Sequence, residues 1–113
     1  IDLQKSDGFT ALMSAAFNGH ERVVDALIRH GADINHQGRD GLTALMCAAI
    51  YDNLASLLRL LRAGADTTLR PANGKTALQL SKEQGSTECV RALEEHAAAE
   101  AAAEAEARKA EVA

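Results

Sequence analysis

The sequence is poor in aromatic residues and has no tryptophan. Phe and Tyr together make up 3% of its 113 residues, while apolar residues as a whole reach 47%. A core must therefore be built mostly from Leu, Val, Ile and the abundant Ala. Ala lets helix axes approach one another and favours the helix itself. The composition predicts closely packed helices in one domain of modest size.

The sequence also lacks any concentration of positive charge. Its 12 Lys and Arg residues do not cluster and are outnumbered by 16 Asp and Glu residues, giving a formal net charge of −4. Nucleic-acid binding needs a basic stripe that displaces counterions, and anionic membranes attract basic segments in the same way. The longest uninterrupted apolar run, Ala44–Ile50, is far shorter than the about 20 residues of a spanning helix. We therefore expect neither nucleic acid nor membrane as a partner.

Cysteine is scarce as well. The two cysteines, Cys47 and Cys89, lie in separate apolar helical patterns. We expect buried free thiols rather than a disulfide, which favours a reducing compartment. Because no signal-peptide pattern opens the sequence, the expected location is intracellular, cytoplasmic or nuclear.

What the sequence does contain is an internal repeat of 33 residues. The segment Asp7–Met13 returns as Asp40–Met46 and again, more loosely, as Asn73–Gln79. Gly31-Ala32-Asp33 likewise recurs at positions 64–66. The first two units are identical at 13 of 33 positions. A fixed period of this length is typical of a solenoid of stacked units.

Each unit shows the pattern of a turn, a short helix, a tight link and a longer helix. An Asp-Gly or Asn-Gly pair supplies the turn, and Thr10, Thr43 and Thr76 stand where a helix N-cap belongs. Gly or Asp provides the link between the two helices, and Gly31 and Gly64 end the second helices. The predicted first helices are Ala11–Phe17, Ala44–Ile50 and Ala77–Lys82, and the second helices start near Glu21, Leu54 and Thr87.

The blocks Asp-Gly-x-Thr-Ala-Leu-Met-x-Ala-Ala and His30–Asn35 resemble the ankyrin repeat over residues 1 to about 96. The resemblance implies an all-α fold, an ankyrin-repeat α-solenoid of three units with a long helical extension at the C-terminus. The family usually has Pro at the position of Ala11 and its equivalents, and His at the position of Met13, Met46 and Gln79. These departures remove some rigidity at the helix start without changing the fold.

The units are predicted at fixed boundaries. Residues 1–6 align with the trailing turn of a preceding repeat, and repeats 1, 2 and 3 span residues 7–39, 40–72 and 73–96. Repeat 3 is interpreted as a cap because Ser81, Lys82 and Glu94 replace apolar residues of the earlier units. Residues 97–113 form an Ala/Glu-rich helical extension that continues the last helix to about Ala110.

No catalytic, cofactor or metal site is expected. Ser14, His20 and Asp33 have scaffold positions in the repeat and belong to no catalytic motif. His30 and His96 are equivalent positions two repeats apart, about 20 Å in a stack of helices. That separation is too large for a shared zinc ion. The chain is therefore predicted not to be an enzyme.

Protein binding is the function that the resemblance implies, through hairpin tips and the exposed side of the first helices. The three aromatic residues fall at such positions, and aromatic side chains are favoured as binding anchors. The alternative is that they fold back and seal the stack. The predicted partner-binding residues are Phe9, Met13, Phe17, Asn18, Arg39, Asp40, Leu42, Met46, Ile50, Tyr51 and Lys75.

We expect a monomeric module that docks another protein. A structural spacer or assembly element within a larger protein, an enzyme included, is the alternative function. The context of Leu27 with Asp33–Asn35 also resembles ankyrin sites of asparagine hydroxylation, which implies Asn35 as the acceptor. The other reading of Asn35 is a hairpin residue that hydrogen-bonds its own backbone.

Overall fold

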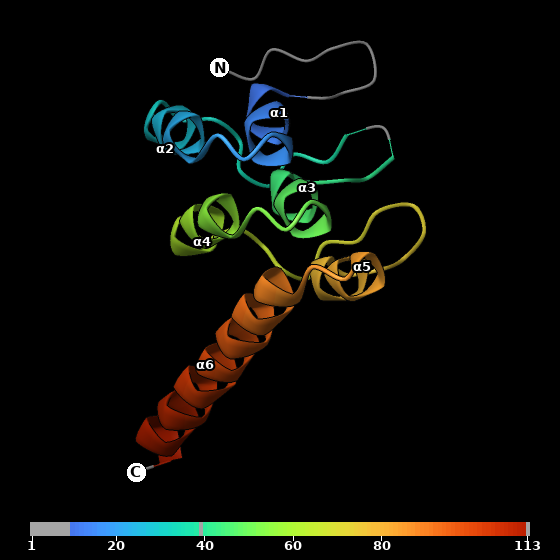
Figure 1. Ribbon diagram of the computed structural model, residues 1–113. Helices are drawn as coiled ribbons and strands as arrows, with labels where there is room; N and C mark the ends of the chain where they lie inside the picture. Colours follow the sequence, from blue (N-terminus) through green and yellow to red (C-terminus); the bar gives the residue numbers. More distant parts are fainter. Residues whose placement is uncertain (1–9, 39, 113) are drawn as a thin grey trace.

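The computed structural model describes residues 10–38 and 40–112, which contain six α-helices and no β-strand. The predicted all-α fold is confirmed. Helices follow one another in three pairs, as Figure 1 shows from the top of the stack downward. The helices are α1 (Ala11–Phe17), α2 (Glu21–Arg29), α3 (Ala44–Ile50), α4 (Leu54–Arg62), α5 (Ala77–Gln84) and α6 (Thr87–Val112).

The first helix of each pair begins at the predicted Thr. The Oγ1 atoms of Thr10 and Thr43 accept hydrogen bonds of 3.2 and 3.3 Å from backbone N–H groups three residues later. Thr76 does the same and forms a full capping box with Gln79. These bonds satisfy N–H groups that a helix start leaves free. At its other end α5 continues two residues past the predicted Lys82, to Gln84, because Gly85 at φ 71° is the residue that stops it.

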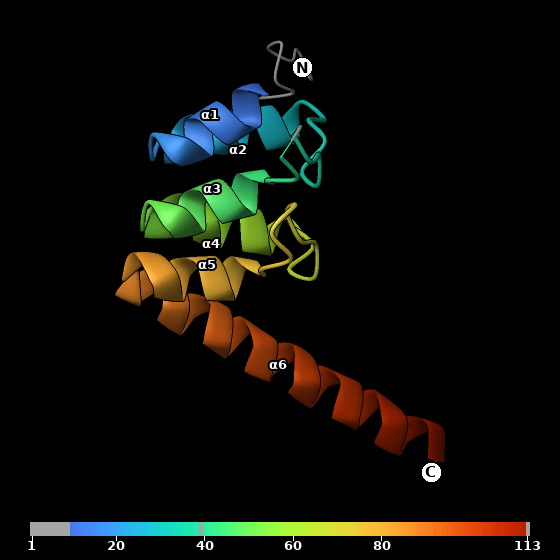
Figure 2. The same cartoon turned by 90° about the vertical axis from the view of Figure 1, so that its right-hand side faces the viewer.

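The three pairs stack as two layers. Helices α1, α3 and α5 pack on one another as an inner layer, and α2, α4 and α6 form an outer layer behind them. Figure 2 shows the hairpins gathered at one end of the inner helices and the tight links gathered at the other. Ala16 and Ala49 are fully buried, and their small side chains let neighbouring helices approach.

Polar contacts tie each tight link to the pair before it. The Asn53 side-chain amide donates to the carbonyl oxygens of Ala16 and Phe17 at 2.7 and 3.0 Å. The Ser86 hydroxyl, one repeat later, donates to the carbonyl of Ile50 at 3.2 Å. Exposed C-terminal carbonyls of the inner helices thus find donors in the next repeat. Asp52 takes the predicted place of a link glycine and has φ 55°.

Polar residues stand in the third helix pair where the earlier pairs have apolar ones. Lys82 and Glu94 are exposed and form an ion pair at 4.0 Å. Ser81 differs from the expectation, because it is fully buried and its hydroxyl donates to the carbonyl of Leu78 at 2.8 Å. Beyond these residues α6 runs out of the stack, with residues 97–110 exposed (Figure 2).

Candidate partner-binding surface

Two aromatic side chains from neighbouring repeats meet on the surface. Phe17 is the last residue of α1, and Tyr51 directly follows α3. Their ring centroids lie 4.2 Å apart with the ring planes tilted by 54°. The two residues are 39% and 52% exposed, so the pair is formed at the surface and not within the core. Such rigid, amphipathic side chains are the usual anchors of protein interfaces.

The neighbours of this pair are of mixed character. Ile50 is half-buried and packs against the core, which makes it a floor beside the rings. Asn18 is exposed, and its side-chain amide donates to the carbonyl of Ser14 at 2.9 Å. We call Phe17, Asn18, Ile50 and Tyr51 the helix-end patch, because all four lie where an inner helix ends.

Met13 and Met46 do not belong to this surface. Both were expected beside the aromatic residues, and both are 1% exposed. That expectation is wrong because α3 is packed on both sides by other inner helices, and residues 44–49 are all buried. The two methionines fill the interior of the stack, where the flexible side chain suits an irregular space.

The other predicted contact residues lie at the hairpin end of the inner helices. Asp40 is exposed and accepts a hydrogen bond from the N–H of Leu42 at 3.2 Å, while Leu42 is half-buried against the core. Lys75 forms an ion pair with Glu83 of α5. Phe9 and Arg39 lie outside the described residues. Leu42 precedes α3 and Ile50 ends it, and the helix between them is about 10 Å long at 1.5 Å per residue.

The surface therefore divides in two. The helix-end patch carries the aromatic rings, and the hairpin end carries the charged and polar groups. Between them the third pair places the Lys75–Glu83 ion pair alongside α5. The prediction of a single apolar patch that includes Leu42 is not met by the described residues, because a buried α3 separates Leu42 from Tyr51.

The comparison with protein families agrees with this architecture. The family model for ankyrin repeats, which covers three copies, matches residues 1–71. The chain belongs to the ankyrin repeat family. Ankyrin repeats are generally protein-interaction modules and typically have no enzymatic activity. No curated protein matched the chain in a separate comparison.

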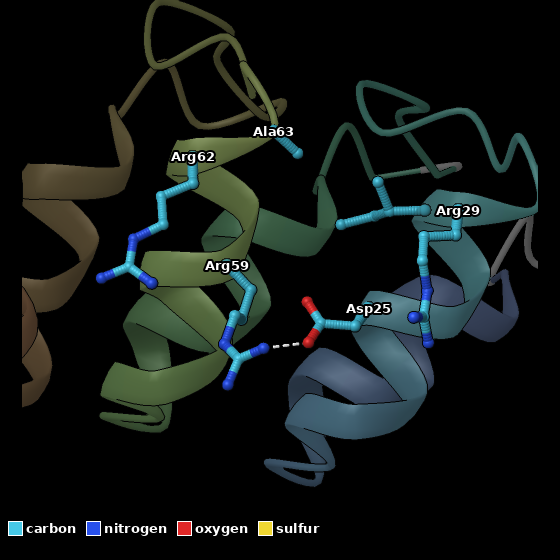
Figure 3. A pocket seen from close by; sticks show the side chains of 6 residues that line it. Asp25, Arg29, Arg59, Arg62 and Ala63 are labelled. Carbon is cyan, nitrogen blue, oxygen red and sulfur yellow. Dashed lines mark hydrogen bonds and ion pairs between the residues drawn. The ribbon is translucent and has the colours of Figure 1, made fainter.

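The outer layer of the ankyrin stack has a shallow groove between α2 and α4, shown in Figure 3. Arg59 of α4 spans it and pairs with Asp25, and it also lies 3.5 Å from a carboxylate oxygen of Glu21. In the figure the side chains of Arg29 and Arg62 do not join this pair. The groove is thus bridged by an ion pair between repeats. Its lining residues are Asp25, Ile28, Arg29, Arg59, Arg62 and Ala63.

The role of Arg59 was missed by the sequence reasoning. The equivalent positions in α2 and α6 are Ala26 and Ala92, so a long cation here departs from the repeat pattern. Comparing the three units at this position could therefore have drawn attention to Arg59. It indicates a contact specific to the boundary between repeats 1 and 2.

The side-chain oxygen of Asn35 accepts a hydrogen bond from the next repeat and not from its own backbone. Its Oδ1 atom accepts from the N–H of Asp66 at 2.8 Å, while its own N–H donates to the Asp33 carboxylate at 3.1 Å. The Asp66 carboxylate accepts from the hydroxyl and N–H of Thr68, and these bonds lower its pKa. Asn35 is exposed, so its side chain is accessible while it holds two hairpins together.

Reactive chemistry is suppressed at the two thiols. Cys47 and Cys89 are free and buried, as predicted. Burial raises the pKa of each thiol to about 12, with the carboxylate of Asp40 adding to the effect on Cys47 and that of Asp52 to the effect on Cys89. A thiol in this state is a poor nucleophile.

Within residues 10–38 and 40–112, no three His, Cys, Asp or Glu side chains are gathered as metal ligands would be. No helix of the same ranges combines the length and apolar character needed to cross a membrane.

Proposed function

We propose that the chain docks a protein partner on its helix-end patch, with Phe17 and Tyr51 as the anchors. The observation that carries this proposal is the exposed ring pair, which joins two repeats at the ends of α1 and α3. In the described residues, the large exposed apolar side chains are these two and Val23. Two adjacent exposed rings lose little side-chain entropy on binding and offer a large apolar area.

The rest of the patch supports recognition of a mixed surface. The half-buried Ile50 provides an apolar floor, and Asn18 provides amide groups at the edge. The Lys75–Glu83 pair and Asp40 add polar contacts toward the hairpins. A partner segment that crosses from the patch toward α5 meets apolar groups first and charged groups at the rim, as in typical interfaces.

The test is partner capture with a matched pair of variants. A Phe17→Ser/Tyr51→Ser variant removes both rings, and an Arg62→Ser variant removes an exposed side chain of α4 outside the helix-end patch. Circular dichroism first establishes that both variants keep the parent's helix content. The parent and Arg62→Ser should retain the same proteins from a cell lysate, and the ring variant should lose them. For a purified partner, the ring variant should bind at least about tenfold more weakly, since an anchor side chain contributes 1–2 kcal/mol or more.

Retention of the same proteins by the ring variant would contradict the proposal. The spacer function would then gain support from α6, which projects out of the stack as an exposed helix. In that case deletion of residues 101–113 should disturb assembly of the host protein while leaving the fold of the repeats intact.

A further inference from the structure

Equivalent positions of the outer helices differ sharply in exposure at the N-terminal end of the stack. Val23 of α2 corresponds to Ser56 of α4 and to Cys89 of α6. Ser56 and Cys89 are 1% and 0% exposed, whereas Val23 is 48% exposed. The Sγ atom of Cys89 lies 3.8 Å from the carbonyl oxygen of Ala48, in the preceding repeat. This position therefore faces the preceding repeat, and in α2 its apolar side chain is left uncovered.

The inner layer shows the same difference. Ala44 and Ala77 are buried where α3 and α5 meet the helix before them, and Ala11 of α1 is exposed. A small side chain at this position lets the preceding inner helix approach. Ala11 keeps that small side chain although no helix of the described residues covers it.

The tight links follow the pattern too. Asn53 and Ser86 donate hydrogen bonds to carbonyls at the end of the preceding inner helix. His20 occupies the equivalent position between α1 and α2 and is exposed. Its imidazole carries an N–H donor, as Asn53 carries amide N–H donors and Ser86 a hydroxyl donor.

The opposite end of the stack is built differently. Ala16 and Ala49 are fully buried against the following repeat, and Lys82 stands exposed at the equivalent position of α5. Leu61 of α4 is similarly replaced by Glu94 of α6, which pairs with Lys82. Polar residues thus close the C-terminal end, while small and apolar ones remain open at the N-terminal end. A terminal repeat needs a polar outer face, whereas the α1–α2 pair exposes Ala11 and Val23 at these positions.

We propose that the N-terminal face of the α1–α2 pair, formed by Ala11, His20 and Val23, binds the helix pair of a further ankyrin repeat. The argument is continuity: the two interfaces inside the stack use the same positions, and this face leaves those positions exposed with a small, a polar and an apolar side chain. A second copy of the chain does not offer the matching surface, because its C-terminal end is polar and carries the projecting α6. This surface is distinct from the helix-end patch.

The test extends the full chain by one helix pair. A copy of residues 7–33 is joined directly before Ile1, so that residues 1–6 follow it as the corresponding residues 34–39 follow the original. This copy contains no cysteine. A second extension uses a copy of residues 40–66 with Ser in place of its cysteine, as in Ser14 of repeat 1. Circular dichroism measures the gain in helix.

The readout is the accessibility of position 23. In a Val23→Cys variant of the parent, a water-soluble thiol reagent should label the new cysteine rapidly, because position 23 is exposed. Cys47 and Cys89 should not react at this rate, since both are buried. In the extended protein, labelling should be about tenfold slower or more, because it then requires local opening of the new interface. A Tyr51→Cys variant, on the helix-end patch, should react at the same rate with and without the extension.

Two results would overturn the inference. One is that position 23 is labelled as fast in both extended proteins as in the parent, or that neither extension gains helix. The other is a parent chain that sediments as a dimer and becomes monomeric on Val23→Asp substitution, since the occupant of the face would then be a second copy. Neither result bears on the helix-end patch, which is tested by partner capture.

Discussion

The Oδ1 atom of Asn35 lies 2.8 Å from the backbone nitrogen of Asp66 and accepts its hydrogen bond. This single bond links the ends of two successive repeats, at equivalent places beyond α2 and α4. Gln37 makes a similar link, donating to the carbonyl of Arg70 at 2.9 Å. Side chains of one repeat thus complete the backbone hydrogen bonding of the next, and this polar ladder runs beside the apolar core.

Replacing Asn35 by Ala should lower the free energy of unfolding by about 1 kcal/mol, because the Asp66 N–H loses its protein acceptor. Urea denaturation followed by circular dichroism measures the effect. Asn73→Ala is the comparison, since the Asn73 side chain accepts only from Lys75 within its own hairpin among the bonds of the described residues. A loss for Asn35→Ala no larger than about 0.3 kcal/mol would show that water replaces the bond at no cost.

Gly41 should tolerate substitution least among the glycines of the hairpins and helix ends. Its φ is 85°, and a Cβ atom built on it lies 2.7 Å from the Cα of Pro71 in the next hairpin. Gly31 and Gly64 also have positive φ, with nothing within 4 Å of such a Cβ. We expect about 1 kcal/mol of destabilisation for Gly31→Ala or Gly64→Ala, and about 2–3 kcal/mol for Gly41→Ala, where a clash adds to the backbone strain. Equal thermal unfolding midpoints for the three variants would argue against the close approach.

Ser56 and Ser81 form a matched test of buried hydroxyl groups. Both are buried, but the Ser56 Oγ atom has no hydrogen-bond partner in the described part of the chain, whereas Ser81 donates to Leu78. A buried hydroxyl without a partner costs about 1–3 kcal/mol. Ser56→Ala should therefore leave the protein equally stable or up to about 1–2 kcal/mol more stable, and Ser81→Ala should cost about 1 kcal/mol. Calorimetry on the two variants decides between this outcome and an equal loss for both.

The stability of the fold should decrease at alkaline pH because of its two thiols. Their folded pKa is about 12, against an ordinary value of 9.0. The unfolded chain therefore loses these protons first, and stability that is full below pH 9 is lost as the pH rises toward 12. Each thiol contributes a slope of at most about 1.4 kcal/mol per pH unit. A Cys47→Ala/Cys89→Ala variant should show a shallower decline in urea titrations over this window, and an unchanged decline would exclude the thiols as its cause.

The helices were predictable because their ends carry strong local signals. Thr10, Thr43 and Thr76 cap the inner helices, and glycines or Asp52 at positive φ close them. Capping and left-handed residues act over three or four positions, so the sequence alone reveals them. The end of α5 was placed two residues early, although Gly85, which stops the helix at φ 71°, directly follows Gln84.

The candidate site was less predictable, because exposure depends on what packs against a helix. Met13 and Met46 sit in seven-residue helices, which are too short for periodicity to separate a buried face from an open one. The Phe17–Tyr51 contact joins residues of different repeats, and so does the bond from Asn35 to Asp66. Such contacts follow from the geometry of stacking, which the pattern within one repeat does not contain.

Helix α6 begins inside the stack, where Cys89 is buried, and continues without a break to Val112. Anything attached at its far end therefore has a fixed angular phase relative to the helix-end patch. Each residue added to or removed from the exposed stretch turns the attachment by about 100° and shifts it by about 1.5 Å. Removing Ala103 alone should turn a group at Lys109 by about 100°, whereas removing the seven residues 97–103 should nearly restore its direction. The number of residues in the exposed part of α6 therefore determines both the distance and the direction of an attached group.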